Sequence, residues 1–589
     1  MNFFSTNEGL FHFVPFLQRT FFPKLPYQTK ASDLKPTICS LGGKNSAIST
    51  QNSHSAKVVS KSQLQSEYFC LKLAVLLLVF LVSSLSISFA EEQMINIKVA
   101  QYPQKIDFVC SQGATWELGG NSGHILSTDT CQLSGVMTTE AKKRYHVIVE
   151  SVPENEPSKI NNSLTLWKSQ GWDVHTLNIG DPVYASDGSL IYDGRTVLIG
   201  VGTFVDQQLA QDLVDKFAAS FTSALIHEEV IYLSQGRITL SLNGSVQAVG
   251  ESFTLVPQQT VLLKKVEYAA GYPWHGFEDR SYRGKLTIRW GAHNALDCIL
   301  NAPLEYVLSG IVPSEISSKA EVGAMQAQAV AARGDILSKI GHAHPGEGFD
   351  ICSEQHCQVF GGETSITGDI AKKILPTYGL IVSNPNGLLV STFYSSNCGG
   401  HSEANQVVWT PPADPALAGT WDTDSPPNLD LSEEEQAGQF IKFPPTCYCS
   451  DTTVEGGDKF RWQKSYSAAD WKEVESNIGV GRIRKITDLA RGFSGRIYQM
   501  TVVGENGKKT LLKELNIRKI FGSLKSSCFV SIFTYDDSGF INGGLLKGAG
   551  FGHGVGMCQT GAQALAKRGW SFDKILSHYF LNTSLKKWY

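Results

Sequence analysis

Residues 304–340 read LEYVLSGIVPSEISSKAEVGAMQAQAVAARGDILSKI, and this stretch decides how the chain is interpreted. It begins with an apolar run that ends in a proline turn, Pro313-Ser314-Glu315. From Val322 onward, apolar residues recur at three- and four-residue spacing, which predicts a helix with one apolar face. Gly341 ends that helix. We therefore expect Glu315 to lie between an apolar run and a buried helix.

A carboxyl group in that position loses water, and desolvation raises its pKa. A raised pKa suits a general acid that works near neutral pH. The alternative is a solvated glutamate in the first turn of the following helix, where the helix dipole stabilises its charge. On the residues alone this alternative is the commoner case, because most acidic residues at helix starts have no other role.

The N-terminal part of the chain carries one strongly apolar segment. Residues 73–90, LAVLLLVFLVSSLSISFA, follow Lys72 and predict a signal peptide cleaved after Ala90 or, alternatively, a retained membrane anchor. Either implies export to the periplasm or cell envelope, with membrane contact through this segment alone. Residues 1–72 show no clear period and are interpreted as a disordered leader or an over-extended gene start. Lys plus Arg number 51 and Asp plus Glu 55, so no basic excess points to a nucleic acid.

The remaining sequence predicts a multidomain, β-rich α+β protein with a few helices. Residues 91–142 read as a small β unit. Residues 143–225 alternate strands with helices at 164–170 and 207–219, which predicts a small α/β module. Strands at 237–242, 260–263 and 285–290 open a larger unit over 228–589. Within that unit, residues 405–455 are rich in Pro, Asp and Glu and predict a long exposed connection.

Cysteines and histidines gather in one short stretch, as in a tetrahedral zinc site. The candidate ligands are His342 or His344, followed by Cys352, His356 and Cys357. A disulfide between the two cysteines is the alternative in an exported chain.

Other cysteines are candidates for different roles. Cys398 and His401 are further candidate ligands if their loop folds back. Cys110 and Cys131 flank a β-rich segment and are a candidate disulfide.

Two glycine-rich loops carry the remaining candidates. SSNCGG at residues 395–400 follows a strand predicted over 388–394, and its glycines let the backbone approach a ligand. The alternative is an ordinary turn between strands. GHGVGMCQ at residues 552–559 surrounds His553 with glycines and predicts an exposed histidine on a flexible loop before a helix. By pattern alone, such a histidine more often has no function.

Six pieces of sequence together resemble the stage II sporulation protein D / LytB family, in family order over about residues 280–585. They are Glu305, IVPSE at 311–315, AQAVAAR at 327–333, CQVFGG at 357–362, CGG at 398–400 and GHGVGMCQTGA at 552–562. The resemblance implies a lytic transglycosylase acting on peptidoglycan glycan strands stripped of stem peptides, with Glu315 as its catalytic residue. It also implies a structural zinc at His344, Cys352, His356 and Cys357.

The chemistry needs a single carboxyl group. Glu315 would protonate the glycosidic oxygen and then accept the proton of the muramic acid 6-hydroxyl, which leaves a 1,6-anhydro end. Hydrolysis usually needs a second carboxylate, and only one is well placed. The residues expected to hold sugar or stabilise developing charge are Ser395, Ser396, Gly399, His553 and Gln559.

The module at 143–225 resembles a SPOR-like domain, whose family binds glycan strands, although a generic spacer fits its loose pattern as well. Two other functions stay open for the chain. One is a non-catalytic peptidoglycan-binding protein that recruits or activates an amidase, with division proteins as further partners. The other is a hydrolase in which zinc performs the chemistry.

Overall fold

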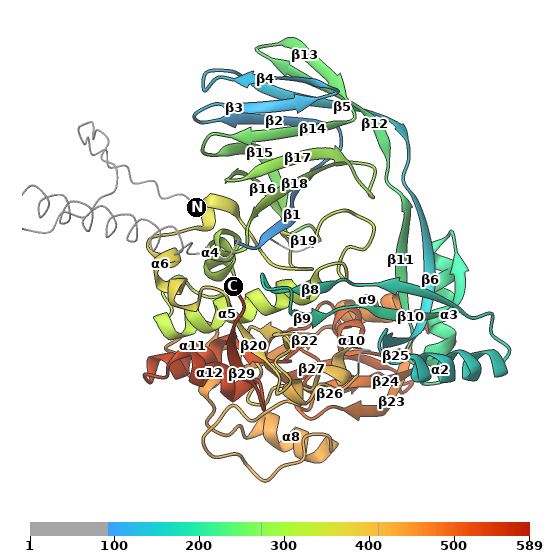
Figure 1. Ribbon diagram of the computed structural model, residues 1–589. Coiled ribbons are helices and arrows are strands. Elements are labelled where there is room, and N and C mark those ends of the chain that lie inside the picture. The colour runs from blue at the N-terminus through green and yellow to red at the C-terminus, as the bar shows by residue number, and fades with distance from the viewer. Residues whose placement is uncertain (1–91, 272–273, 410–411) are drawn as a thin grey trace, which may run out of the picture. The chain divides into compact units, whose positions relative to one another are not determined.

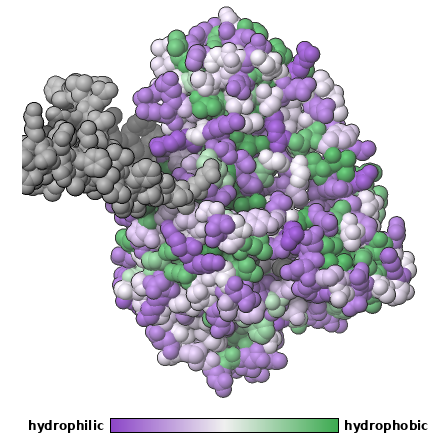
Figure 2. All heavy atoms as spheres, viewed as in Figure 1, coloured by the Kyte–Doolittle hydropathy of each residue, from purple (hydrophilic) through white to green (hydrophobic). Residues whose placement is uncertain are grey.

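The computed structural model describes residues 92–271, 274–409 and 412–589 (Figure 1). These residues belong to one compact unit, Ser88–Tyr589, whereas the predicted leader and signal segment lie outside the described residues. Among the described helices, none is both long enough and apolar enough to cross a membrane. On the face seen in Figure 2, hydrophilic and hydrophobic residues are interspersed. The strand-rich arrangement confirms the predicted α+β class.

Two large sheets enclose one core. The first has the strand order β19-β1-β18-β17-β14-β3-β4, and the second has the order β13-β12-β5-β2-β15-β16. Their strands are β1 (Met94–Tyr102), β2 (Lys105–Cys110), β3 (Ala114–Leu118), β4 (Asn121–Ile125), β5 (Cys131–Thr139), β12 (Gln235–Leu242), β13 (Ser245–Gly250), β14 (Ser252–Pro257), β15 (Val261–Tyr268), β16 (Gly276–Tyr282), β17 (Lys285–Trp290), β18 (Leu296–Pro303) and β19 (Ile351–Cys352). Alternate residues face inward, and the rings of Phe108 and Phe253 meet in the core, 6.0 Å apart.

The sheets do not stop at the boundary expected for a separate β unit over 91–142. β1 pairs with β18, and β5 pairs with β12, so residues on both sides of the α/β module share the same two sheets. Alternation along a strand tells which side chains face the core but not which strand lies alongside. Residues 92–139 and 235–303 therefore form one β domain.

The α/β module is inserted between β5 and β12. Its four strands, in the order β11-β6-β10-β7, pair antiparallel, and two helices contribute to its own core. The elements are β6 (Lys142–Pro153), α2 (Pro157–Ser169), β7 (His175–Ile179), β10 (Thr196–Phe204), α3 (Gln207–Ala219) and β11 (Leu225–Tyr232). The helix predicted at 207–219 is confirmed, and the earlier helix begins at Pro157 rather than 164.

A hairpin leaves this module between its second and third strands. It consists of β8 (Pro182–Tyr184) and β9 (Leu190–Asp193). The Gly180 N–H beside it donates to the Gly341 carbonyl at 2.9 Å, just beyond the end of α5 (Val322–Lys339). Gly341 adopts a φ of +66°, as its predicted role in ending that helix requires.

α5 is the central helix, and it packs against α4 (Leu304–Glu315), α11 (Gln559–Lys567) and α12 (Phe572–Tyr579). A buried ion pair joins α4 to α5, because the Arg333 guanidinium donates to both carboxylate oxygens of Glu305 at 2.7 and 2.8 Å. The helix predicted from Val322 is confirmed. The prediction that the apolar run ends in a turn at Pro313 is wrong, because α4 is helical through Glu315 and contains Pro313 in its last turn. A run that short does not distinguish a helix from a strand by periodicity.

The segment at 405–455 is only partly the exposed connection that its composition predicts. It contains α7 (Asn405–Val408) and α8 (Glu434–Lys442), and Phe440, Cys447 and Cys449 are buried. The Pro, Asp and Glu residues lie mainly in its turns and at exposed positions. A few apolar residues nevertheless pack the segment against β26 (Phe529–Tyr535) and β27 (Ile541–Ala549).

The C-terminal part contains several small sheets. One has the order β22-β27-β26 and another β23-β24-β25, while β20 pairs with β29 and β21 with β28. The elements not yet named are α6 (Ile370–Ile374), β20 (Leu380–Ser383), β21 (Tyr394–Ser395), β22 (Arg461–Tyr466), α9 (Ala468–Ile478), β23 (Ile483–Arg491), β24 (Ile497–Gly504), β25 (Gly507–Leu512), α10 (Glu514–Ile520), β28 (Met557–Cys558) and β29 (Ser584–Lys587). The strand predicted over 388–394 is wrong except at its last residue, because the observed strand β21 comprises only Tyr394 and Ser395.

Candidate active site

Glu315 is the last residue of α4 and is half-buried. Its carboxylate accepts a hydrogen bond from the Val359 N–H at 3.0 Å. Desolvation raises the pKa of Glu315, and the nearby charge of Asp335 raises it further. The alternative of a solvated glutamate in the first turn of the next helix is therefore wrong, because that helix begins seven residues later in the chain, at Val322.

One glutamine contacts Glu315, and a second glutamine contacts the first. Gln559 donates through Nε2 to the backbone carbonyl of Glu315 at 2.8 Å and to Oε1 of Gln328 at 3.3 Å. Gln559 begins α11, and Gln328 lies on α5 with no exposed surface. Gln559 was expected from the sequence and Gln328 was not, although a glutamine on the buried face of an alanine-rich helix is a signal in itself.

A buried polar network lies behind the glutamate. Asp335 accepts a hydrogen bond from Lys339 Nζ at 2.6 Å and another from the Gln358 side chain, which in turn accepts one from the Tyr394 hydroxyl. Asp335 is 3% exposed. The carboxylate that acts on the pKa of Glu315 is thus buried and already hydrogen-bonded, so among the described residues of this network only Glu315 offers a carboxyl group for chemistry.

The loop after β21 approaches this network through a parallel pairing of β21 with β28, in which Ser395 lies opposite Cys558. Ser395 is buried, and its Oγ has no hydrogen-bond partner among the described residues. The Ser396 carbonyl accepts from the Thr560 N–H at 3.1 Å. Both serines are therefore held close to the start of α11.

Gly399 lies in a different environment from the two serines. It is buried with φ +81°, and a Cβ added to it would come 2.9 Å from the Gly550 nitrogen. Its carbonyl accepts from the Arg461 guanidinium at 2.9 Å. Close backbone packing explains this glycine, and the structure offers no free surface there for a sugar.

His553 is half-buried, not exposed as its glycine neighbours predict. Its ring lies 5.0 Å from that of Trp409, which comes from the segment that composition assigned to an exposed connection. Nδ1 accepts a hydrogen bond from the Val555 N–H at 3.0 Å. Desolvation lowers the pKa of His553 to about 3, so the imidazole is neutral at physiological pH.

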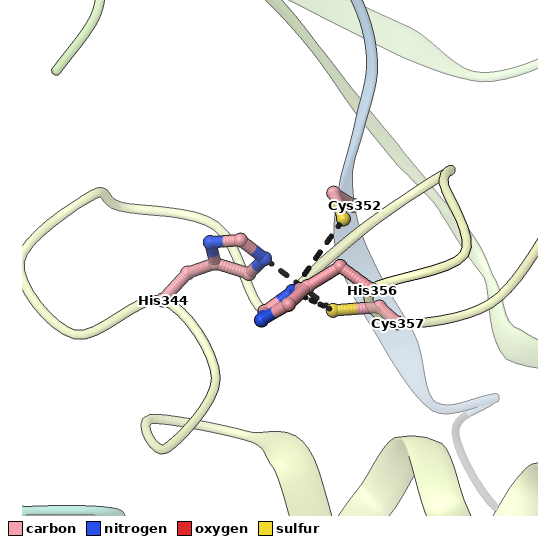
Figure 3. Close-up of side chains that lie close together, drawn as sticks. All are labelled: His344, Cys352, His356 and Cys357. Atoms are coloured by element: carbon pink, nitrogen blue, oxygen red, sulfur yellow. Dashed lines mark hydrogen bonds between the residues drawn. The ribbon is translucent and has the colours of Figure 1, made fainter. Parts of the chain in front are cut away.

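The predicted ligand set forms a compact group, which we call the local cluster: His344, Cys352, His356 and Cys357 (Figure 3). Its ligand atoms all lie within 4.8 Å of one another. Cys357 Sγ is 3.3 Å from His344 Nε2 and 3.4 Å from His356 Nδ1, and Cys352 Sγ is 3.9 Å from His356 Nδ1. The cluster contains His344 and not His342, and both cysteines are free thiols.

These four side chains fit a zinc ion. Bonds of 2.0–2.3 Å in a tetrahedron place ligand atoms about 3.3–3.8 Å apart, close to the separations observed. His344 Nδ1 lies 2.8 Å from a Glu347 carboxylate oxygen, the outer contact that orients a metal-binding imidazole. Hydrogen bonding from Cys357 lowers the pKa of the Cys352 thiol, which favours the thiolate that a metal requires.

Two contacts connect the loop of the local cluster to Glu315 and to the neighbouring helix α5. Val359, which donates to Glu315, lies two residues after Cys357. Lys339 Nζ donates to the Cys357 carbonyl at 2.9 Å and so joins the same loop to α5. Cys352 itself is placed by β19, which pairs parallel with β1 of the β domain.

The other predicted cysteine and histidine sites turn out differently. His401 Nδ1 contacts the Ser402 carbonyl at 2.6 Å, its ring packs on Trp421, and it belongs to neither group of potential ligands among the described residues. Cys110 and Cys131 are buried free thiols rather than the candidate disulfide. Cys398 lies outside the local cluster.

The fold and site define a β-rich protein with one half-buried carboxyl group at a helix end, beside a four-ligand cysteine and histidine cluster. Residues 292–383, which contain both features, match the family described as Stage II sporulation protein, and residues 403–556 match a Domain of unknown function (DUF8618). Over residues 292–383 the chain is therefore similar to the stage II sporulation protein family, in agreement with the resemblance found in the sequence.

Individual relatives agree with this assignment. The amidase enhancer of Bacillus subtilis is 28% identical over 305 residues, which are 47% of this chain and 40% of that protein. The stage II sporulation protein D of B. subtilis is 25% identical over 308 residues, 49% of this chain and 75% of that protein. An uncharacterised Brachyspira hyodysenteriae protein is 23% identical over 62% of this chain and 84% of its own length. The matched region thus spans less than half of the amidase enhancer.

Proposed function

We propose that the protein is an exported lytic transglycosylase that remodels the cell wall at division or during development. It would cleave the bond between N-acetylmuramic acid and N-acetylglucosamine in glycan strands stripped of stem peptides, and leave 1,6-anhydromuramyl ends. The names of its relatives, a sporulation protein and an amidase enhancer, support a role connected with the cell wall. The observation that carries the proposal is Glu315, a half-buried carboxyl group with a raised pKa, whose neighbouring carboxylate in the part of the chain that the structure describes, Asp335, is already paired with Lys339.

In the proposed reaction, protonated Glu315 gives its proton to the glycosidic oxygen as the bond to the anomeric carbon breaks. The carboxylate then takes the proton of the muramic acid 6-hydroxyl, whose oxygen bonds to the anomeric carbon. No water is consumed, and Glu315 ends protonated as it began. One group serves as acid and then as base, as microscopic reversibility requires.

The neighbouring residues have supporting roles in this proposal. The Val359 N–H stabilises and orients the carboxylate form of Glu315 at 3.0 Å. Gln559 fixes the backbone at the end of α4, and Ser395, Ser396 and His553 are proposed to contact sugar. Zinc bound at the local cluster would fix the loop that carries Val359, since four protein ligands leave no open position for chemistry at the metal.

Targeting and partners belong to the proposal as well. The α/β module at 142–232 would bind glycan strands as SPOR-like domains do, and the segment at 73–90 would direct export or anchor the chain. The βαββαβ order of the module and its antiparallel four-stranded sheet are compatible with glycan binding, but many unrelated modules share both features.

A second candidate function has its own support. The amidase enhancer of B. subtilis is named for its effect on an amidase, so a non-catalytic protein that binds peptidoglycan and recruits or activates an amidase is the alternative. The two functions differ in whether Glu315 performs chemistry.

The test is to incubate the purified protein and its Glu315→Gln variant with denuded glycan strands and to analyse the products by mass spectrometry. Glutamine keeps the shape of the side chain but cannot donate or accept the proton. We expect anhydromuramyl ends from the wild type alone, with unchanged zinc content in the variant. Reducing ends would indicate a hydrolase, and strand binding by both proteins without products would establish the non-catalytic alternative.

A further inference from the structure

Four buried side chains that the proposed reaction does not use meet behind the active site. We call them the dispersed cluster: Cys398, Asp422, Cys449 and Cys558. Their ligand atoms lie within 4.8 Å of one another, and Cys398 Sγ is 3.6 Å from Cys449 Sγ. Each residue is at most 2% exposed. Asp422 and Cys449 lie within the domain of unknown function, and none of the four lies in the region matched to the sporulation family.

Backbone contacts bring the four segments together. The Cys398 N–H donates to Cys558 Sγ at 3.1 Å, and the Cys449 N–H donates to the Asp422 carboxylate at 2.8 Å. The Asp422 N–H donates to the Gly400 carbonyl at 3.0 Å. The parallel pairing of β21 with β28 aligns the first and last of these segments.

A bound cation would offset the charge that these four ligands carry when ionised. A buried carboxylate is costly unless it is paired or bound to a metal. Asp422 takes part in no ion pair among the described residues. Its second carboxylate oxygen accepts a hydrogen bond from the Tyr579 hydroxyl at 2.6 Å. Three thiols share the same dry space, and neutral thiols are weak partners for a carboxylate.

The surroundings resemble those of a thiolate–metal centre. Besides Cys398, the Gly561 N–H donates to Cys558 Sγ at 3.4 Å, and the Gly400 N–H donates to Cys398 Sγ at 3.4 Å. Such outer contacts orient metal ligands and stabilise their charge. The space is also tightly bounded, because a Cβ at Gly561 would come 2.6 Å from an Asp422 carboxylate oxygen.

We propose that Cys398, Asp422, Cys449 and Cys558 bind a second, structural zinc ion. Three thiolates and one carboxylate complete a tetrahedron, and the 3.6 Å between two of the sulfurs is close to the edge of about 3.8 Å that Zn–S bonds of 2.3 Å produce. The ion joins four segments that are distant in the sequence. It also fixes Cys558, the residue before Gln559, so the metal holds the start of α11 against the end of α4. This inference does not rest on the proposed reaction.

Zinc content tests the proposal directly. The full-length chain, untagged and purified without chelator, is expected to contain two zinc ions per chain when its metal content is measured by inductively coupled plasma mass spectrometry. Cys449→Ser should lower the content to one, and so should His356→Ala through the local cluster. Cys447→Ser is the matched control, because Cys447 is equally buried and two residues away but lies outside the cluster. It should retain two.

A measurement on the wild type covers the case in which Cys449→Ser does not fold. Cobalt can replace zinc, and the intensity of its thiolate-to-cobalt absorption band rises with the number of cobalt–thiolate bonds. If both clusters bind cobalt, the intensity should correspond to five thiolates. If only the local cluster binds cobalt, it should correspond to two. A single metal ion that His356→Ala removes would overturn the proposal. A Cys398–Cys449 disulfide, found by peptide mass spectrometry without reductant, would overturn it as well.

Discussion

The local and dispersed clusters contain similar ligands and are assembled in opposite ways. The local cluster comes from a single stretch between His344 and Cys357, and one of its residues, His356, is exposed. The dispersed cluster draws on four segments between Cys398 and Cys558, and all four of its residues are buried. A metal in the first would order one loop next to Glu315. A metal in the second would cross-link four segments of the C-terminal part. Loss of the first metal should therefore have different consequences for the protein from loss of the second.

The largest expected effect follows from removing the local metal. Cys357→Ser should lower glycan cleavage by about 100-fold, because the loop that carries the Val359 N–H would no longer hold Glu315 in place. Product formation and zinc content are measured together, and one zinc should remain. Cys528→Ser is the control, since Cys528 is buried but belongs to neither cluster. Cleavage at the wild-type rate by a variant without local zinc would break the link between that cluster and catalysis.

A smaller effect is expected when the local cluster keeps its ligands but loses their support. Glu347→Gln weakens the contact with His344 Nδ1, and loss of such outer contacts lowers metal affinity by roughly 10- to 100-fold. Competition with a chelator of known affinity measures the change, and the dispersed zinc should be unaffected. Glu363→Gln, in a glutamate paired with Arg283, serves as the control. Equal weakening of both metals would mean that the clusters are not independent.

The difference in burial should appear in the rate of metal loss. In excess chelator, we expect two phases of equal amplitude, with the dispersed zinc leaving slower by on the order of tenfold or more, because its release requires local opening of the structure. A coloured zinc indicator follows both phases. A single phase at the faster rate would show that burial in the dispersed cluster does not protect its metal.

The smallest expected effect concerns pH. The pKa of Glu315 is raised, so the group stays protonated to higher pH than an ordinary glutamate, and cleavage should decline as pH rises through that pKa. Asp335→Asn removes a negative charge that raises this pKa, so the decline should move to lower pH. Rates across a pH series measure the shift. Asp369→Asn, in an exposed carboxylate, should leave the profile in place, and a shift to higher pH in Asp335→Asn would contradict the assignment.

The sequence predicted those features of the structure that depend on residues close together in the chain. The spacing around Val322 predicted α5, and the alternating strands and helices predicted the α/β module with α3 at its observed bounds. The residue pattern made Glu315 a candidate acid and the local cluster a candidate zinc site, because the ligands of the cluster lie close together in the chain, and the resemblance implied the roles of both. Their proposed roles stay predictions.

What the sequence did not predict depends on contacts between distant residues. Strand partners were missed because alternation does not specify them, so the β domain was divided at the wrong place. Asp422 and Cys449 were missed because they lie in a Pro- and acid-rich segment whose composition hides a few buried positions. The hydrogen bond from the Val359 N–H to Glu315 belongs to the backbone and leaves no trace in residue identity.

The insertion of the α/β module between β5 and β12 has an evolutionary and a mechanical consequence. Thr139 and Gln235, at the two ends of the insertion, lie opposite each other in the register of one sheet. A deletion that joins β5 to β12 through a tight turn would leave a plain hairpin, so the module is a unit that a lineage can gain or lose without rebuilding the domain beneath it. Because two connections attach the module, a protease that cuts either one does not release it, as a cut would release a domain on a single linker.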